Sequence, residues 1–278
     1  MSVVDTAADV TVARVMVDTP LAHLDRLFDY AVPDGMTVTA GMRVRVRFSG
    51  RLVDGYVLDV GTGSTHSRRL ASVERVIGTE PMLTDETATL FRAVADRMAG
   101  TFSDVARLGV PPRHARAEAT HWRPGERRLV ADTAGWGRYQ AGPAFVDAVR
   151  DGRPARAVWS ALPSEDWPLR LAELAQVALT QDRGVVLVVP DNRDVQRVDG
   201  RLSEVLGEGQ HLVLTADLGP ERRYRNWLAV RRGEVRVVLG TRSATFAPVA
   251  DPGLLGIWDD GDDLHAEPRA PYPHSRDV

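Results

Sequence analysis

The spacing of apolar residues changes along this chain of 278 residues, and this change constrains its fold more than any other feature. From Val12 to about Pro81, apolar and polar residues alternate in short runs that Pro-Asp-Gly, Ala-Gly and Ser-Gly turns separate. A period of two is typical of β-strands, so this region predicts a small barrel or sandwich. From about Arg138, helical and strand-like segments alternate, which predicts a doubly wound α/β domain with a parallel sheet.

The β-rich region contains four expected strands and is followed by two expected helices. The strands are Val12–Val17, Thr37–Phe48, Gly55–Val60 and Leu70–Ile77. Val44, Val46 and Phe48 share one face of the second strand, and we interpret Arg43, Arg45 and Arg47 as its solvent-facing side. Thr84-Asp85-Glu86-Thr87 predicts the capped start of a helix that runs to Gly100, and a second helix is expected at Phe102–Leu108.

The α/β region contains four expected helices, three expected strands and an apolar stretch. The helices are Gln140–Val149, Leu169–Leu179, Val195–Leu206 and Pro220–Val230; the strands are Val185–Val189, Val235–Leu239 and Leu254–Trp258; the apolar stretch is Ala157–Leu162. We therefore expect a disordered tail at 1–11, a β-rich domain at 12–81, a helical segment at 82–112, a linker at 113–138 and the α/β domain at 139–278. The linker holds a basic cluster, which is either solvated or in contact with a phosphate backbone.

Composition excludes several classes of site. All 35 basic side chains are arginine, because the chain has no lysine. The absence of cysteine excludes disulfides, thiolate zinc sites and cysteine nucleophiles, and the seven histidines show no ligand spacing, so no metal site is expected. A net charge of −3 means that local patches must carry any affinity for nucleic acid. No apolar run approaches the ~20 residues of a membrane span. We expect a cytoplasmic, nucleoid-associated protein.

Two blocks of sequence resemble the primosomal protein N′ (PriA) family of replication-restart helicases, in particular its actinobacterial branch. Asp18–Leu58 is similar to the family's domain that binds the 3′ end of a nascent DNA strand. Val238–Asp260 is similar to its strand, Gly-Thr-Arg-Ser loop and acidic motif II, and Val186–Asp191 stands where the family has a strand ending in Pro-Glu. The resemblance implies a small β-barrel followed by a RecA-like helicase lobe. The second lobe is not expected on this chain, which we interpret as a truncated protein or part of a longer one.

The resemblance implies a pocket for the terminal nucleotide. Phe28 and Asp29 match the family's Phe-Asp pair, in which an aromatic face supports a base or sugar and a carboxylate accepts a hydrogen bond from a 3′ hydroxyl. Gly50 matches a glycine that lets the strand end approach the backbone. The family's basic residue before the last strand aligns with Ala71, and Arg69 is the nearest arginine. Spacing alone favours another interpretation, in which Phe28 is a core aromatic and Asp29 a turn residue.

The same alignment implies that the nucleotide site is degenerate. Pro163–Trp167 stands in place of the family's phosphate loop, with Asp166 at the lysine and Trp167 at the magnesium-binding threonine. Motif II retains Asp259 but has Asp260 in place of a glutamate. Arg242 of the Gly-Thr-Arg-Ser loop is either a phosphate contact or a structural residue. ATP, magnesium and zinc are expected for the family, but no cofactor is expected here.

We therefore expect a replication-restart protein that binds forked DNA through the nascent 3′ end and lacks ATPase and helicase activity. The expected partners are stalled or branched forks, primosome proteins and single-strand-binding proteins. Two alternatives remain open: an ATP-driven 3′–5′ DNA helicase, as in the wider family, and a protein-interaction scaffold that does not bind DNA.

Overall fold

The computed structural model describes residues 10–64, 69–128 and 132–278, so most of the expected tail at 1–11 lies outside the described residues. The chain divides into two compact units. The first comprises residues 1–115 together with Arg269–Tyr272, and the second comprises Arg116–Pro268 and Pro273–Val278. Among the described residues, no helix is both long and apolar enough to cross a lipid bilayer.

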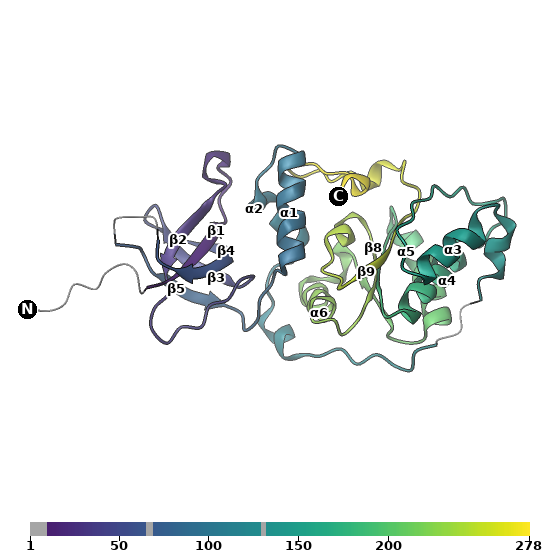
Figure 1. Cartoon of the computed structure of the whole chain (residues 1–278), viewed down its shortest axis with the longest axis horizontal. Coiled ribbons are helices and arrows are strands. Elements are labelled where there is room, and N and C mark those ends of the chain that lie inside the picture. Colours follow the sequence, from purple (N-terminus) through teal and green to yellow (C-terminus); the bar gives the residue numbers. More distant parts are fainter. Residues whose placement is uncertain (1–9, 65–68, 129–131) are drawn as a thin grey trace, which may run out of the picture. The chain divides into compact units, whose positions relative to one another are not determined.

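The first unit is built on an antiparallel five-stranded sheet with the order β2-β1-β4-β3-β5 (Figure 1). One face of this sheet holds the core, in which Val15, Val44, Val46 and Val57 are fully buried. An isolated bridge between Ala31 and Ser72 joins the end of β2 to the residue before β5. The two edge strands therefore approach each other at one point. The strands are β1 (Thr11–Val17), β2 (Leu27–Ala31), β3 (Arg43–Phe48), β4 (Arg51–Thr62) and β5 (Val73–Ile77).

Two of the expected strands are shorter than predicted, and one strand was not predicted. The expected strand at Thr37–Phe48 begins only at Arg43. Gly41 has a φ of +81°, and a Cβ atom there would lie 2.0 Å from the carbonyl oxygen of Leu83, so this part of the chain is a turn that requires glycine. The expected strand at Leu70–Ile77 begins at Val73. Strand β2 was missed because its alternating run is only five residues long.

Both expected helices of this unit are confirmed. α1 (Asp85–Arg97) is capped by Thr84, whose Oγ1 accepts a hydrogen bond from the Thr87 backbone N–H at 3.1 Å. α2 (Phe102–Gly109) begins with a capping box. Asp25, in the loop before β2, fixes both helices, because it accepts a hydrogen bond from the backbone N–H of Phe102 at 3.0 Å and pairs with Arg92 at 2.6 Å. The helices are thus part of the same folded unit as the sheet.

The second unit is an α/β fold with an all-parallel sheet of order β7-β8-β6-β9. Figure 1 shows α6 on one side of this sheet and α4 and α5 on the other, as right-handed crossovers in opposite directions require. The sheet is fully buried along β6 and β8, which explains their continuous apolar runs. The strands are β6 (Gly184–Val188), β7 (His211–Leu214), β8 (Val237–Gly240) and β9 (Pro252–Ile257); the helices are α3 (Gly142–Arg150), α4 (Trp167–Thr180), α5 (Asn192–Leu206) and α6 (Pro220–Arg231).

The predicted helices and strands of this region are confirmed to within a few residues, and two features differ. β7 was not predicted, although it forms an edge of the sheet. The described part of the expected linker from Arg116 onwards is bound to the α/β unit by hydrogen bonds. The backbone N–H of Trp122 hydrogen-bonds to Glu234 at 2.8 Å, and its indole donates to the carbonyl of Gly209 at 2.9 Å. This segment is therefore fixed to the α/β unit.

Candidate DNA-end site and candidate nucleotide site

Phe28 lies on β2 with its ring partly buried against the core of the sheet. Its ring meets that of Phe48 edge to face, with the centroids 4.8 Å apart. The guanidinium of Arg26 lies over the Phe28 ring, 4.6 Å from its centroid. Phe28 therefore has a structural role, as the alternative from spacing predicted, and it also supports an exposed cation.

Asp29 follows Phe28, so its side chain points to the other face of β2. Its register partner on β1 is Arg14, but the Arg14 guanidinium pairs with Asp59 at 2.5 Å instead. The Asp29 Oδ2 atom accepts a hydrogen bond from the Ser64 hydroxyl at 2.6 Å. Among the described residues Asp29 has no cationic partner.

Gly50 forms the tip of the β3–β4 hairpin with Ser49, and both have positive φ angles, of +78° and +47°. Nothing lies within 4 Å of a Cβ atom built on Gly50, so the backbone there is open to approach. Because Phe48 precedes this tip and touches Phe28, the structure brings Gly50 and Phe28 to the same end of the sheet.

Arg69 is exposed and lies at the start of the segment that returns to β2. Two residues later, the carbonyl of Ala71 accepts a hydrogen bond from the backbone N–H of Ala31 at 2.9 Å. The expected site therefore draws on β2, the hairpin tip and this returning segment. No contact joins the side chains of Arg69 and Asp29 among the described residues.

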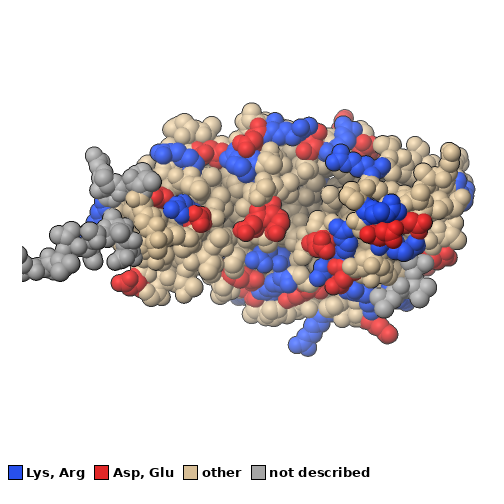
Figure 2. All heavy atoms as spheres, viewed as in Figure 1, with Lys and Arg blue, Asp and Glu red and all other residues tan. Residues whose placement is uncertain are grey.

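The arginines of β3 are held by acidic side chains. Arg43 and Arg45 both bind Asp54, at 2.8 and 2.6 Å, and Arg47 binds Glu74 at 3.3 Å. Their placement on the face opposite the core is confirmed, since Val44 and Val46 between them are fully buried. Only Arg47 is exposed, because Arg43 and Arg45 are half-buried and Arg43 lines a cavity below α2. Figure 2 likewise shows acidic and basic side chains interspersed on the face it draws. The stripe is therefore locally neutralised.

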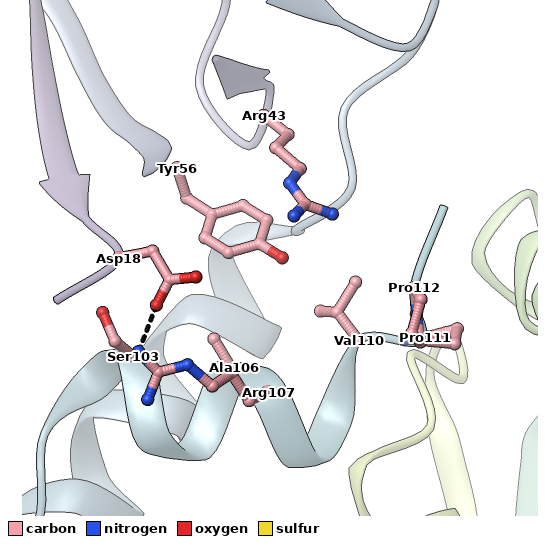
Figure 3. A pocket seen from close by; sticks show the side chains of 9 residues that line it. All are labelled: Asp18, Arg43, Tyr56, Ser103, Ala106, Arg107, Val110, Pro111 and Pro112. Carbon is pink, nitrogen blue, oxygen red and sulfur yellow. Dashed lines mark hydrogen bonds and ion pairs between the residues drawn. The ribbon is translucent and has the colours of Figure 1, made fainter. Parts of the chain in front are cut away.

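A cavity of about 210 Å³ lies between α2 and the face of the sheet that carries Arg43 and Tyr56 (Figure 3). Tyr56 forms one wall, and burial raises the pKa of its hydroxyl to about 12. The charged side chains at the cavity are paired: Arg107 binds Asp18 at 2.5 Å, and Arg43 binds Asp54. Ala106, Val110, Pro111 and Pro112 make the remaining wall largely apolar.

In the α/β unit, the beginning of α4 holds the residues that the resemblance aligns with a phosphate loop. Asp166 is the N-cap of this helix, because its carboxylate accepts a hydrogen bond from the backbone N–H of Leu169 at 3.2 Å, and it also pairs with Arg201 at 2.5 Å. The side chain of Glu165 is buried, with Arg138 at 3.1 Å and Arg170 at 3.4 Å. Paired carboxylates therefore surround the start of this helix.

Trp167 fills the space beside this helix start. Its ring stacks on that of Trp258, which directly follows β9, with the centroids 4.0 Å apart and the planes inclined by 4°. Trp159 extends the cluster, 5.7 Å from Trp258, and the Arg197 guanidinium lies over Trp167 at 5.0 Å. In parallel α/β sheets, ligands bind between the carboxyl ends of the strands and the helix N-termini. Here side chains occupy that position.

The remaining predicted residues lie near β8 and β9. Asp259 is exposed with a φ of +50°, and Asp260 binds Arg276 at 3.0 Å. Arg242 binds the buried Glu267 at 3.0 Å and donates to the carbonyl of Leu264, which supports its structural role. Across the described ranges, no three His, Asp or Glu side chains group in a way that would hold a metal ion.

Three residues at these sites were missed from the sequence. The contact of Arg26 could have been predicted from the sequence, because residues i and i+2 of an extended chain share a face and Phe28 is two residues after Arg26. The contact of Ser64 could not, since Ser64 is 35 residues from Asp29. Trp258 is an aromatic residue at the carboxyl end of a predicted strand, but its partner Trp167 is known only from the fold.

Comparison with known proteins identifies relatives of both units. The family model of the 3′ DNA-binding domain (3′BD) of PriA matches residues 14–111, which span β1 to α2. The chain is 50% identical over 92% of its length to a probable replication restart protein PriA of Mycobacterium tuberculosis and 46% identical, also over 92%, to that of Mycobacterium leprae. It spans 40% of the length of each. A replication restart protein PriA of Bacillus subtilis is 35% identical over 31% of the chain and 11% of its own length. The chain belongs to the PriA family of replication restart proteins, and its first unit is the family's 3′ DNA-binding domain.

Proposed function

We propose that this protein binds branched DNA at replication forks by holding the 3′ end of the nascent strand on its first unit. The observation that carries the proposal is the Asp29 carboxylate, which is partly exposed within the matched domain and has no cationic partner among the described residues. Oδ2 already accepts one hydroxyl, that of Ser64. The proposal is that Oδ1 accepts a second, the 3′ hydroxyl of the strand.

The chemistry of a carboxylate makes this site selective for the state of the strand end. A 3′ hydroxyl donates a charge-assisted hydrogen bond to Asp29, whereas a 3′ phosphate brings two negative charges together. The open backbone at Gly50, at the same end of the sheet as Phe28, leaves room for the terminal sugar. The protein would thereby distinguish an extendable end from a blocked one.

We further propose that the α/β unit does not hydrolyse ATP. Phosphoryl transfer is catalysed almost wholly by positioning and by charge neutralisation. Asp166 and Trp167 supply neither at the start of α4, and the stack of Trp167 on Trp258 fills the space between that helix and β9. The unit would then act as a rigid platform, and by resemblance its partners would include primosome and single-strand-binding proteins.

Fluorescence anisotropy with three forked DNAs tests the end-binding proposal. The forks are identical except that the nascent strand ends in a 3′ hydroxyl, a 3′ hydrogen or a 3′ phosphate. We expect the hydroxyl end to bind about tenfold or more tighter than the hydrogen end, as a hydrogen bond to a charged group predicts, and the phosphate end to bind weakest. Asp29→Asn should lose the discrimination against phosphate, whereas Asp34→Asn, which removes an exposed turn carboxylate, should retain it.

Equal affinities for the three ends would refute the end-binding proposal. The proposal for the α/β unit is tested separately by an ATPase assay in the presence of forked DNA. The unaltered protein is compared with the double mutant Asp166→Lys, Trp167→Thr, which introduces the lysine and threonine of the family's phosphate loop. We expect no turnover above background by the unaltered protein. DNA-stimulated turnover that requires Asp259 would contradict this part of the proposal and favour the helicase alternative.

A further inference from the structure

Arg26 differs from the paired arginines of β1 and β3 because its guanidinium lies over an aromatic ring rather than beside a carboxylate. Arg14, Arg43, Arg45 and Arg47 each lie within 3.3 Å of a carboxylate oxygen. Within the part of the chain that the structure describes, Arg26 has no acidic partner, and its side chain is exposed. Its contact is with the ring of Phe28, at 4.6 Å.

The ring beneath Arg26 is itself fixed. Phe28 is packed against the core of the sheet and against Phe48, at 4.8 Å. A planar guanidinium stacked on a fixed ring loses less freedom on binding an anion than a free side chain would. The contact also covers the Phe28 face that Arg26 overlies. An incoming nucleotide would therefore meet the guanidinium at this position before it meets the ring.

Arg26 and Asp29 stand on opposite sides of an edge strand. Arg26 directly precedes β2 and shares the side of Phe28, whereas Asp29 points to the other face. Three residues of chain span at most about 11 Å, so the end of a DNA strand that lies along the edge of β2 can reach both groups. The terminal hydroxyl is a donor for Asp29, and the preceding phosphates are anions, for which Arg26 supplies the positive charge.

We propose that Arg26 binds a backbone phosphate close to the 3′ end of the nascent strand, and that Phe28 is the positioning residue which holds its guanidinium in place. This inference rests on the proposed function, since it assigns a second contact at the same site. Phe28 then acts through Arg26 rather than as an open stacking surface for a base.

The salt dependence of fork binding tests this assignment. Loss of one phosphate contact lowers the magnitude of the slope of log K against log salt concentration by about 0.9. For Arg26→Gln we expect roughly tenfold weaker binding of the fork with a 3′ hydroxyl, as for a lost hydrogen bond to a charged group, together with that change in slope. Arg26→Lys should retain the slope. Arg75→Gln, which removes an exposed arginine of β5 on the same unit, serves as the matched control and should leave both values unchanged.

The outcomes separate this inference from the function on which it rests. If the unaltered protein prefers the 3′ hydroxyl and Arg26→Gln keeps the original slope, the phosphate contact is refuted and the end-binding proposal stands. If Arg26→Gln weakens binding without changing the slope, Arg26 has only a structural role. If the unaltered protein shows no end preference, both proposals fail. Thermal unfolding of each variant verifies that the first unit remains folded.

Discussion

Replacement of Trp167 by alanine tests whether the start of α4 is a packed structural element. The side chain of Trp167 is only 6% exposed and stacks on Trp258. Burial of about 150–250 Å² of aromatic surface, at about 25 cal/mol per Å², stabilises the fold by about 4–6 kcal/mol. Replacement of buried aromatic residues by alanine typically costs about 3–5 kcal/mol, so we expect a loss of about 4 kcal/mol in the free energy of unfolding.

Urea unfolding followed by tryptophan fluorescence measures this loss for the α/β unit specifically. All six tryptophans lie in that unit: Trp122, Trp136, Trp159, Trp167, Trp227 and Trp258. Val158→Ala is the control, because Val158 is fully exposed, and it should change the stability by no more than about 0.5 kcal/mol. A loss below about 1 kcal/mol for Trp167→Ala would refute the idea that the aromatic stack holds α4 against β9.

Two further predictions concern charged residues of α4. Burial raises the pKa of Glu173 to about 7, so the folded protein binds more protons than the unfolded chain between pH 4.5 and 7. Stability should therefore fall by roughly 2–3 kcal/mol as the pH rises through that window and level off above it, and Glu173→Gln should remove this dependence in urea titrations at several pH values. A pH profile unchanged by the substitution would contradict this. Asp166→Ala should lower the free energy of unfolding by about 1 kcal/mol through loss of the N-cap. Asp166→Asn should lower it by only about a few tenths of a kcal/mol, because Asn also caps a helix and the partly exposed pair with Arg201 contributes little. Equal losses in the two variants would show that the cap is unimportant.

The elements that the sequence predicts well are those whose pattern is long and local. Helix α1 was identified together with its cap, because Thr84 and the apolar residues that follow it at helical spacing lie close together in the sequence. The buried strands β6 and β8 were identified from continuous apolar runs, which are typical of strands that are covered on both faces. Short elements such as β2 and β7 were missed because five or four residues hold too few periods to distinguish a strand from a loop.

Site geometry depends on contacts that no local pattern contains. The sequence identified Asp29 by resemblance, but not that Ser64 would donate to it or that Arg14 would turn away to Asp59. Likewise, the resemblance drew attention to Asp166 and Trp167, whereas the stacking partner Trp258 lies 91 residues further along the chain. The apolar stretch Ala157–Leu162 shows the same limit, because only the fold reveals that Val158 is fully exposed while the neighbouring Trp159 packs inward.

The anisotropy titration of the three forked DNAs is the most direct measurement of the central claim. The account predicts that the unaltered protein binds the fork with a 3′ hydroxyl more tightly than the fork with a 3′ hydrogen, and binds the fork with a 3′ phosphate most weakly. It also predicts that Asp29→Asn narrows the difference between hydroxyl and phosphate ends. Equal binding of all three forks, or an unchanged preference in Asp29→Asn, would contradict the role assigned to the Asp29 carboxylate.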